Sequence, residues 1–211
     1  VYEQASKAKR LSGVIAAVDD ERVYDALVAH GGKAMMTAKD HPTGTDRLAE
    51  VAAAHPEAEL IINVQGDEPL IEPALIDALA AAFDDDPELQ MATVKSPMTD
   101  VEEMKNPNNV KVVTDKKGYA LYFSRSLLPY PRENTGAVVY KHIGIYAYKR
   151  DFLLNYAKMA PTQLEQTESL EQLRALENGY KIKVIATDFH FVGVDTPEDL
   201  VEVNRLYQER L

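Results

Sequence analysis

Short apolar runs alternate with helix-length amphipathic segments along most of the chain. The apolar runs predict strands at residues 13–18, 33–37, 60–64, 90–97 and 181–187. The segments between them predict helices at residues 20–30, 46–55, 73–83 and 161–179, followed by a last helix that runs to the C-terminus. Strands that alternate with helices are typical of βαβ units, so the pattern predicts an α/β fold with a mainly parallel sheet flanked by helices.

The middle of the chain has a different pattern. Residues 109–126 contain two β-rich runs joined by the turn Lys116-Lys117-Gly118, which predicts an antiparallel hairpin, and residues 138–150 are again strand-rich. In the helix predicted at 161–179, Thr162 and Glu165 have the spacing of a capping box. Because no linker is long enough to separate two units, we predict one domain over residues 1–211, with an antiparallel arm at about 108–160.

Composition and charge narrow the class of protein. The chain of 211 residues is long enough to bury a sizeable core. The net charge of −11 argues against broad binding to nucleic acid, which requires a basic surface. No segment approaches the ~20 apolar residues of a membrane span, and there is no cysteine and no signal-peptide pattern. We therefore expect a cytoplasmic protein with no membrane insertion.

Carboxylates cluster where predicted strands end. Asp67 and Glu68, in the stretch "NVQGDEPLI", follow the most apolar strand, and Asp195 precedes the last helix. Ligands of open α/β sheets bind beyond the carboxyl ends of the strands, and Mg²⁺ prefers oxygen ligands. This pattern suggests a Mg²⁺ site that binds phosphates. The alternative is that Glu68 and Asp195 only begin helices and that Asp67 is a turn residue.

Two other regions could bind ligands. The stretch "DHPTGTDR" at residues 40–47 opens a helix, and its free N–H groups, with Thr43, Thr45 and Arg47, could bind a nucleotide or phosphate; the alternative is a capped helix with an exposed arginine. Arg125 and His142 lie in aromatic β-rich runs, where a histidine is commonly hydrogen-bonded within the core. The sequence contains no GxGxxG or Walker loop and no Ser-His-Asp order.

Taken in order, the stretches "DHPTGTDR", "NVQGDEPLI", "NPNNVKVV", "GYALYFSR", "KHIGIYAY", "LEQLRALENG" and "GVDTPEDL" resemble the 3-deoxy-manno-octulosonate (Kdo) cytidylyltransferases over essentially the whole chain. This resemblance implies a Rossmann-like nucleotidyltransferase domain that transfers CMP from CTP to the anomeric hydroxyl of Kdo and releases pyrophosphate. It also implies a Mg²⁺ cofactor, a role in lipopolysaccharide biosynthesis and a homodimer, in which the antiparallel arm takes part.

The resemblance also assigns roles to residues. It implies Asp67 and Asp195 as Mg²⁺ ligands, with Gln65 close to the reacting centre, and these are the expected catalytic residues. It implies nucleotide contacts from Thr43, Gly44, Arg47 and Gln65, sugar-acid contacts from Arg125, His142 and Tyr146, and contacts to the sugar hydroxyls from Glu171 and Gln172.

One part of the family pattern is not found in the sequence. Relatives open with a strand and a loop whose arginine and lysine grip the triphosphate, and we expect that segment to precede Val1 in the whole protein. The alternatives are a truncated chain that only binds a sugar acid or dimerises, a cytidylyltransferase for another acidic sugar such as sialic acid, and, on weaker grounds, a glycosyltransferase.

Overall fold

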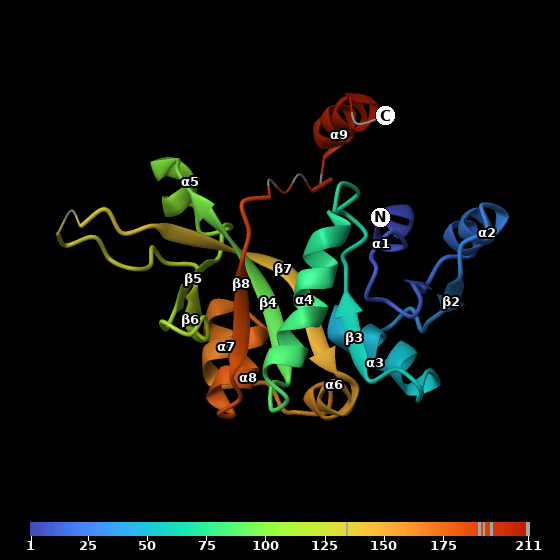
Figure 1. Ribbon diagram of the computed structural model, residues 1–211, viewed down its shortest axis with the longest axis horizontal. Helices are drawn as coiled ribbons and strands as arrows, with labels where there is room; N and C mark the ends of the chain where they lie inside the picture. Colours follow the sequence, from blue (N-terminus) through green and yellow to red (C-terminus); the bar gives the residue numbers. More distant parts are fainter. Residues whose placement is uncertain (134, 190, 192, 195, 210–211) are drawn as a thin grey trace.

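The computed structural model describes residues 1–133, 135–189, 191, 193–194 and 196–209. The main sheet has the strand order β6 (Ala120–Ser124), β5 (Lys111–Thr114), β7 (Val139–Lys149), β4 (Met91–Met98) and β8 (Ile182–Ala186). The strand β3 (Leu60–Asn63) pairs with the second half of β7, and β1 (Ala16–Val18) pairs with β2 (Ala34–Met36) in a separate parallel sheet (Figure 1). The predicted α/β class is confirmed.

The sheet is mixed in direction. Strands β4 and β8 are parallel, whereas β7 is antiparallel to β3, β4 and β5. Consequently β3, β4 and β8 run in the same direction, as expected for strands from βαβ units, and β7 runs between them in the opposite direction. Although β7 lies within the predicted arm at 108–160, it pairs with strands of the main sheet, and the loop at residues 127–133 and 135–138 is what projects from the body (Figure 1).

Helices cover both faces of the main sheet. On one face, α4 (Pro73–Asp85) packs Leu75, Ile76 and Leu79 against the apolar residues of β7. The other face packs against α6 (Arg150–Tyr156), α7 (Gln163–Glu168) and α8 (Gln172–Glu177), and α3 (Gly44–Ala54) contacts α6. Burial of these two apolar layers is the main source of stability for a fold of this kind.

The remaining helices lie at the periphery of the sheets (Figure 1). They are α1 (Tyr2–Ala5), α2 (Glu21–Ala29), α5 (Val101–Lys105) and α9 (Pro197–Glu209). Among the described residues, no helix is both long enough and apolar enough to cross a membrane.

The prediction of one continuous helix at 161–179 is wrong. Helices α7 and α8 are separate, and Ser169 between them adopts φ 52, in the left-handed region that ends a helix. The predicted capping box of Thr162 and Glu165 is present at the start of α7. Because of the break, Glu171 is the N-cap of a second helix, and Gln172 is its first residue.

Candidate functional site

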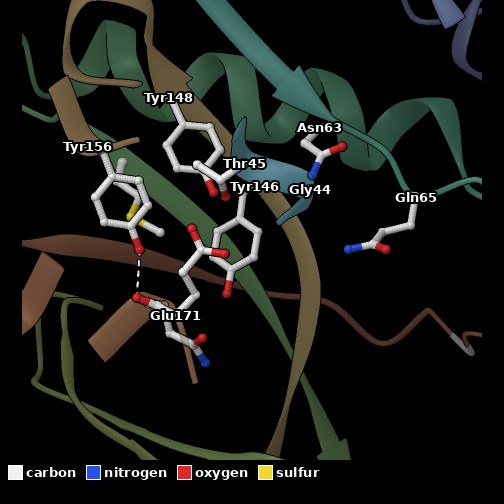
Figure 2. A pocket seen from close by; sticks show the side chains of 10 residues that line it. Gly44, Thr45, Asn63, Gln65, Tyr146, Tyr148, Tyr156 and Glu171 are labelled. Carbon is white, nitrogen blue, oxygen red and sulfur yellow. Dashed lines mark hydrogen bonds between the residues drawn. The ribbon is translucent and has the colours of Figure 1, made fainter. Parts of the chain in front are cut away.

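A pocket of about 200 Å³ lies at the carboxyl end of β3, between the first turn of α3, the middle of β7 and the start of α8 (Figure 2). A water molecule occupies about 30 Å³ in the liquid, so this space can hold a small organic molecule or several waters. Residues with predicted roles from distant parts of the chain line it together, namely Gly44, Gln65, Tyr146, Glu171 and Gln172.

The pocket exists because β7 alternates its side chains between the two faces of the sheet. Tyr146 and Tyr148 therefore point to the same face, with their rings stacked at a centroid distance of 5.7 Å. Tyr156, from α6, packs beside Tyr148 and donates a hydrogen bond to the Glu171 carbonyl at 2.6 Å (Figure 2). The tyrosines thus connect the sheet to the start of α8.

Glu171 and Gln172 offer hydrogen bonds to a ligand. Glu171 Oε1 and Gln172 Nε2 are buried and have no hydrogen-bond partner among the described residues. Burial raises the pKa of the Glu171 carboxyl, and a hydrogen bond with the Thr45 hydroxyl opposes this rise. Buried polar groups without partners are costly, so an acceptor and a donor left open in one pocket suit a ligand that carries hydroxyl groups.

The first turn of α3 is held by local polar contacts. The Thr43 hydroxyl accepts from the Asp46 N–H at 3.3 Å and Asp46 Oδ2 accepts from the Thr43 N–H at 3.2 Å, which forms a capping box. The Thr43 hydroxyl also donates to Asp46 Oδ2 at 2.8 Å. Arg47 donates to Thr37 Oγ1 at 2.7 Å and to Asp19 Oδ2 at 2.6 Å, at the ends of β2 and β1. Gly44 lines the pocket, whereas the predicted nucleotide contacts Thr43 and Arg47 do not.

Asp67 lies in the turn after β3. Its carbonyl oxygen accepts a hydrogen bond from the Val194 N–H at 2.9 Å, so the segment before α9 lies against the turn that follows β3. Asp195, the other predicted metal ligand, lies outside the described residues, and the described residues contain no cluster of three metal-binding side chains. The Asp67 carboxylate is exposed and supplies the oxygen donors that a hard cation prefers, so the described half of the predicted site fits Mg²⁺.

Arg125 and His142 do not line the pocket. Arg125 donates to the carbonyls of Glu168 at 2.7 Å, Pro107 at 3.1 Å and Ser169 at 3.2 Å. His142 is buried between Phe123 and Tyr146, and burial lowers its pKa to about 3. His142 is therefore a neutral residue of the core at pH 7. Its link to the pocket is its contact with Tyr146, which lines the pocket.

Several lining residues were not predicted, among them Asn63, Tyr148 and Tyr156, whereas Thr45 was among the residues expected to bind a nucleotide or phosphate. A period of two along β7 could have identified Tyr148 from Tyr146, because alternate residues of a strand share a face. Tyr156 carries no such signal, since its helix begins directly after β7 and was not expected.

Comparison with known proteins identifies the class and then the family. The sequence profile described as Cytidylyltransferase matches residues 1–182. A solved structure titled CMP:2-keto-3-deoxy-manno-octonic acid synthetase complexed with CTP superposes with a TM-score of 0.94 at 44% identity, over all of this chain and 86% of that one. The 4-diphosphocytidyl-2C-methyl-D-erythritol synthase of Anaerococcus prevotii shares the fold at 16% identity, with a TM-score of 0.64 over 98% of this chain and 86% of that one. The fold and the matching family model are those of a nucleotidyltransferase.

Curated relatives are more specific. The 3-deoxy-manno-octulosonate cytidylyltransferase of Fusobacterium nucleatum is 54% identical over 209 residues, which cover 99% of this chain and 85% of that protein. The protein of the same name from Geobacter metallireducens is 54% identical over 214 residues, covering 96% of this chain and 84% of that protein. This chain belongs to the cytidylyltransferase family and, within it, to the 3-deoxy-manno-octulosonate cytidylyltransferases.

Proposed function

We propose that this protein transfers CMP from CTP to the anomeric hydroxyl of Kdo, releases pyrophosphate and so activates Kdo for lipopolysaccharide biosynthesis. One observation carries the proposal: the residues expected to bind the sugar, Tyr146, Glu171 and Gln172, line the same pocket as Gly44 and Gln65, which are expected to bind the nucleotide. Family membership supports the same reaction, and the sialic-acid alternative is not favoured by the relatives.

The chemistry is an in-line displacement at the α-phosphorus of CTP. The anomeric oxygen of Kdo forms the new P–O bond, the bond to the bridging oxygen of pyrophosphate breaks, and the hydroxyl proton is lost. Both reactants are anionic, so holding them at reacting distance is a large part of the task. In our proposal the first turn of α3 and Gln65 orient the nucleotide, while Glu171 and Gln172 orient the sugar from the start of α8.

Mg²⁺ is the proposed cofactor, held by Asp67 and Asp195. When bound it neutralises charge on the phosphates. The hydrogen bond between the Asp67 carbonyl and the Val194 N–H supports this pairing, because it brings the residue next to Asp195 against Asp67. We further propose sugar-acid contacts from Arg125 and His142 and nucleotide contacts from Thr43 and Arg47. CTP as a substrate indicates a cytoplasmic site of action.

We also propose that the protein is a homodimer. In the projecting loop Tyr130 is 80% exposed and Val138, just before β7, is 50% exposed, while Leu121 of β6 is 62% exposed and Val101 of α5 is 56% exposed. Large apolar side chains that are exposed can contribute to an interaction surface, and the arm is the segment that the family resemblance implicates in dimerisation. Light scattering on the purified protein tests this proposal, and a monomer at all concentrations overturns it.

The central experiment is a pyrophosphate-release assay with CTP, Mg²⁺ and Kdo, performed on the whole protein, with N-acetylneuraminate as the competing acidic sugar. Pyrophosphate release with Kdo but not with N-acetylneuraminate supports the proposal. Release with N-acetylneuraminate instead, or with neither sugar, overturns it.

A further inference from the structure

Thr93 in β4 is fully buried, and its hydroxyl contacts three polar atoms. Its Oγ1 lies 2.8 Å from the Ile145 carbonyl oxygen, 3.0 Å from His142 Nε2 and 3.1 Å from the Ile143 carbonyl oxygen. A hydroxyl group has one proton to donate, and carbonyl oxygens can only accept. The Thr93 hydroxyl therefore donates its proton to the carbonyl oxygens. Its lone pairs are then left to accept a hydrogen bond from His142 Nε2–H.

This arrangement defines the tautomer of His142. A neutral imidazole carries one proton, so protonation at Nε2 leaves Nδ1 as an acceptor. Burial lowers the pKa of His142 to about 3, which is consistent with a neutral ring at pH 7. A neutral histidine cannot pair with a sugar carboxylate as a cation, but its Nδ1 can accept a hydrogen bond from a hydroxyl group.

The same hydroxyl stabilises a β-bulge in β7. The pairing between β4 and β7 shifts at Thr93: Thr93 pairs with Tyr146, whereas Val94 pairs with Ile143, so Gly144 and Ile145 are extra residues. Bulged residues lose regular ladder partners. Thr93 satisfies the carbonyl of Ile145, and Gln65 Nε2 donates to the carbonyl of Gly144 at 3.3 Å.

We infer that Thr93 is a positioning residue of the sugar site: it holds His142 as the neutral Nε2–H tautomer and fixes the bulge at Gly144 and Ile145, which orients Tyr146. The inference rests on the proposed function, because it takes the part of the pocket lined by Tyr146, Glu171 and Gln172 to be the Kdo site. Thr93 does not line the pocket. Its effect on the site is therefore transmitted through His142 and the bulge.

The tautomer is tested first, without any substrate. Two-bond ¹H–¹⁵N correlation spectra of protein labelled at its five histidines distinguish the two neutral tautomers and the charged ring, and His142→Gln assigns the signal. We expect the Nε2–H pattern for His142 at pH 7. An Nδ1–H pattern or a charged ring overturns the inference, whether or not the protein turns over CTP and Kdo.

Turnover is tested with a matched pair of variants. Thr93→Val has a similar shape without the hydroxyl, and we expect about a tenfold higher KM for Kdo with the KM for CTP unchanged. Thr93→Ser retains the hydroxyl and should restore the KM and the Nε2–H pattern. A folded Thr93→Val with wild-type spectra and KM overturns the inference, and if that variant does not fold, the wild-type spectrum still decides. Absence of pyrophosphate release by the wild-type protein contradicts the proposed function, not the tautomer.

Discussion

The carbonyl oxygen of Asp67 accepts a hydrogen bond from the N–H of Val194 at 2.9 Å. The contact joins the turn after β3 to the segment before α9 through main-chain atoms. The Asp67 side chain is not part of it, so that carboxylate can be changed without removing the contact. This separation of backbone and side-chain roles makes the proposed metal ligand a clean target for substitution.

We expect Asp67→Asn to abolish turnover while leaving the melting temperature unchanged. Loss of one carboxylate ligand weakens binding of the cation that neutralises the phosphates. This should raise the activation free energy by several kcal/mol, which lowers the rate about a thousandfold. Pyrophosphate release and Mg²⁺-dependent binding of CTP by calorimetry measure the effect. Asp25→Asn, at an exposed position of α2, is the control and should behave as wild type. Near-normal turnover in Asp67→Asn contradicts the metal assignment.

Glu171→Leu should separate function from stability. The Glu171 side chain makes no capping hydrogen bond to α8, and its Oε1 is buried without a partner among the described residues. The substitution loses the hydrogen bond with the Thr45 hydroxyl but also removes a buried oxygen that has no partner, so the free energy of unfolding should change by no more than about 1 kcal/mol. The KM for Kdo should rise about tenfold, because a contact to the sugar hydroxyls is lost.

Steady-state kinetics and thermal unfolding of the Glu171→Leu variant check both statements. Gln166→Leu, an exposed position on α7, is the control and should change neither quantity. A rise in the KM for CTP alone would assign Glu171 to the nucleotide and not to the sugar.

Arg125→Ala should mainly raise the KM for Kdo, by about tenfold or more, since hydrogen bonds to a charged partner contribute ~1.5–3 kcal/mol. The guanidinium is held by three carbonyls, those of Pro107, Glu168 and Ser169, which fixes it between β6 and the end of α7. Arg125→Lys keeps the charge but loses the planar geometry and should recover only part of the affinity. Kinetics in which only the KM for CTP changes would show that Arg125 serves the other substrate.

The buried pair of Glu165 and Arg174 should contribute to stability and not to turnover. Arg174 donates to both carboxylate oxygens, at 2.5 and 2.8 Å, and both side chains are nearly inaccessible. Glu165→Gln leaves the Arg174 charge without its carboxylate, and we expect a loss of about 3 kcal/mol in the free energy of unfolding. The exposed pair of Glu202 and Arg205 is the control, and Glu202→Gln should leave the denaturation midpoint unchanged. Equal midpoints for the two variants would contradict this prediction.

The sequence predicts the layers of this fold better than its site. Apolar runs such as the one that ends in β3, Leu60–Asn63, pair with neighbouring strands, so strand positions follow from local pattern. The pocket depends on features that local pattern does not encode. Ser169 adopts a left-handed conformation that ends α7, and the bulge at Gly144 and Ile145 changes the register of β7. The bulge depends on a tertiary contact, since the Thr93 hydroxyl comes from a strand far away in sequence, and the Ser169 carbonyl likewise accepts a hydrogen bond from the distant Arg125. Only the family resemblance brought Tyr146, Glu171 and Gln172 together beforehand.

His142 should make the protein less stable as the pH falls below about 6.5. The unfolded chain protonates this histidine near its ordinary pKa of 6.5, whereas burial lowers the pKa in the folded protein to about 3. Between these values the unfolded state binds more protons, so His142 contributes a loss of up to ~1.4 kcal/mol per pH unit in the free energy of unfolding as the pH falls. His142→Gln cannot titrate and should show a shallower dependence over this window in urea unfolding at a series of pH values. Thr93→Val should keep the wild-type slope, because the imidazole remains buried, and an equal slope for His142→Gln and wild type would show that the ring is not buried neutral.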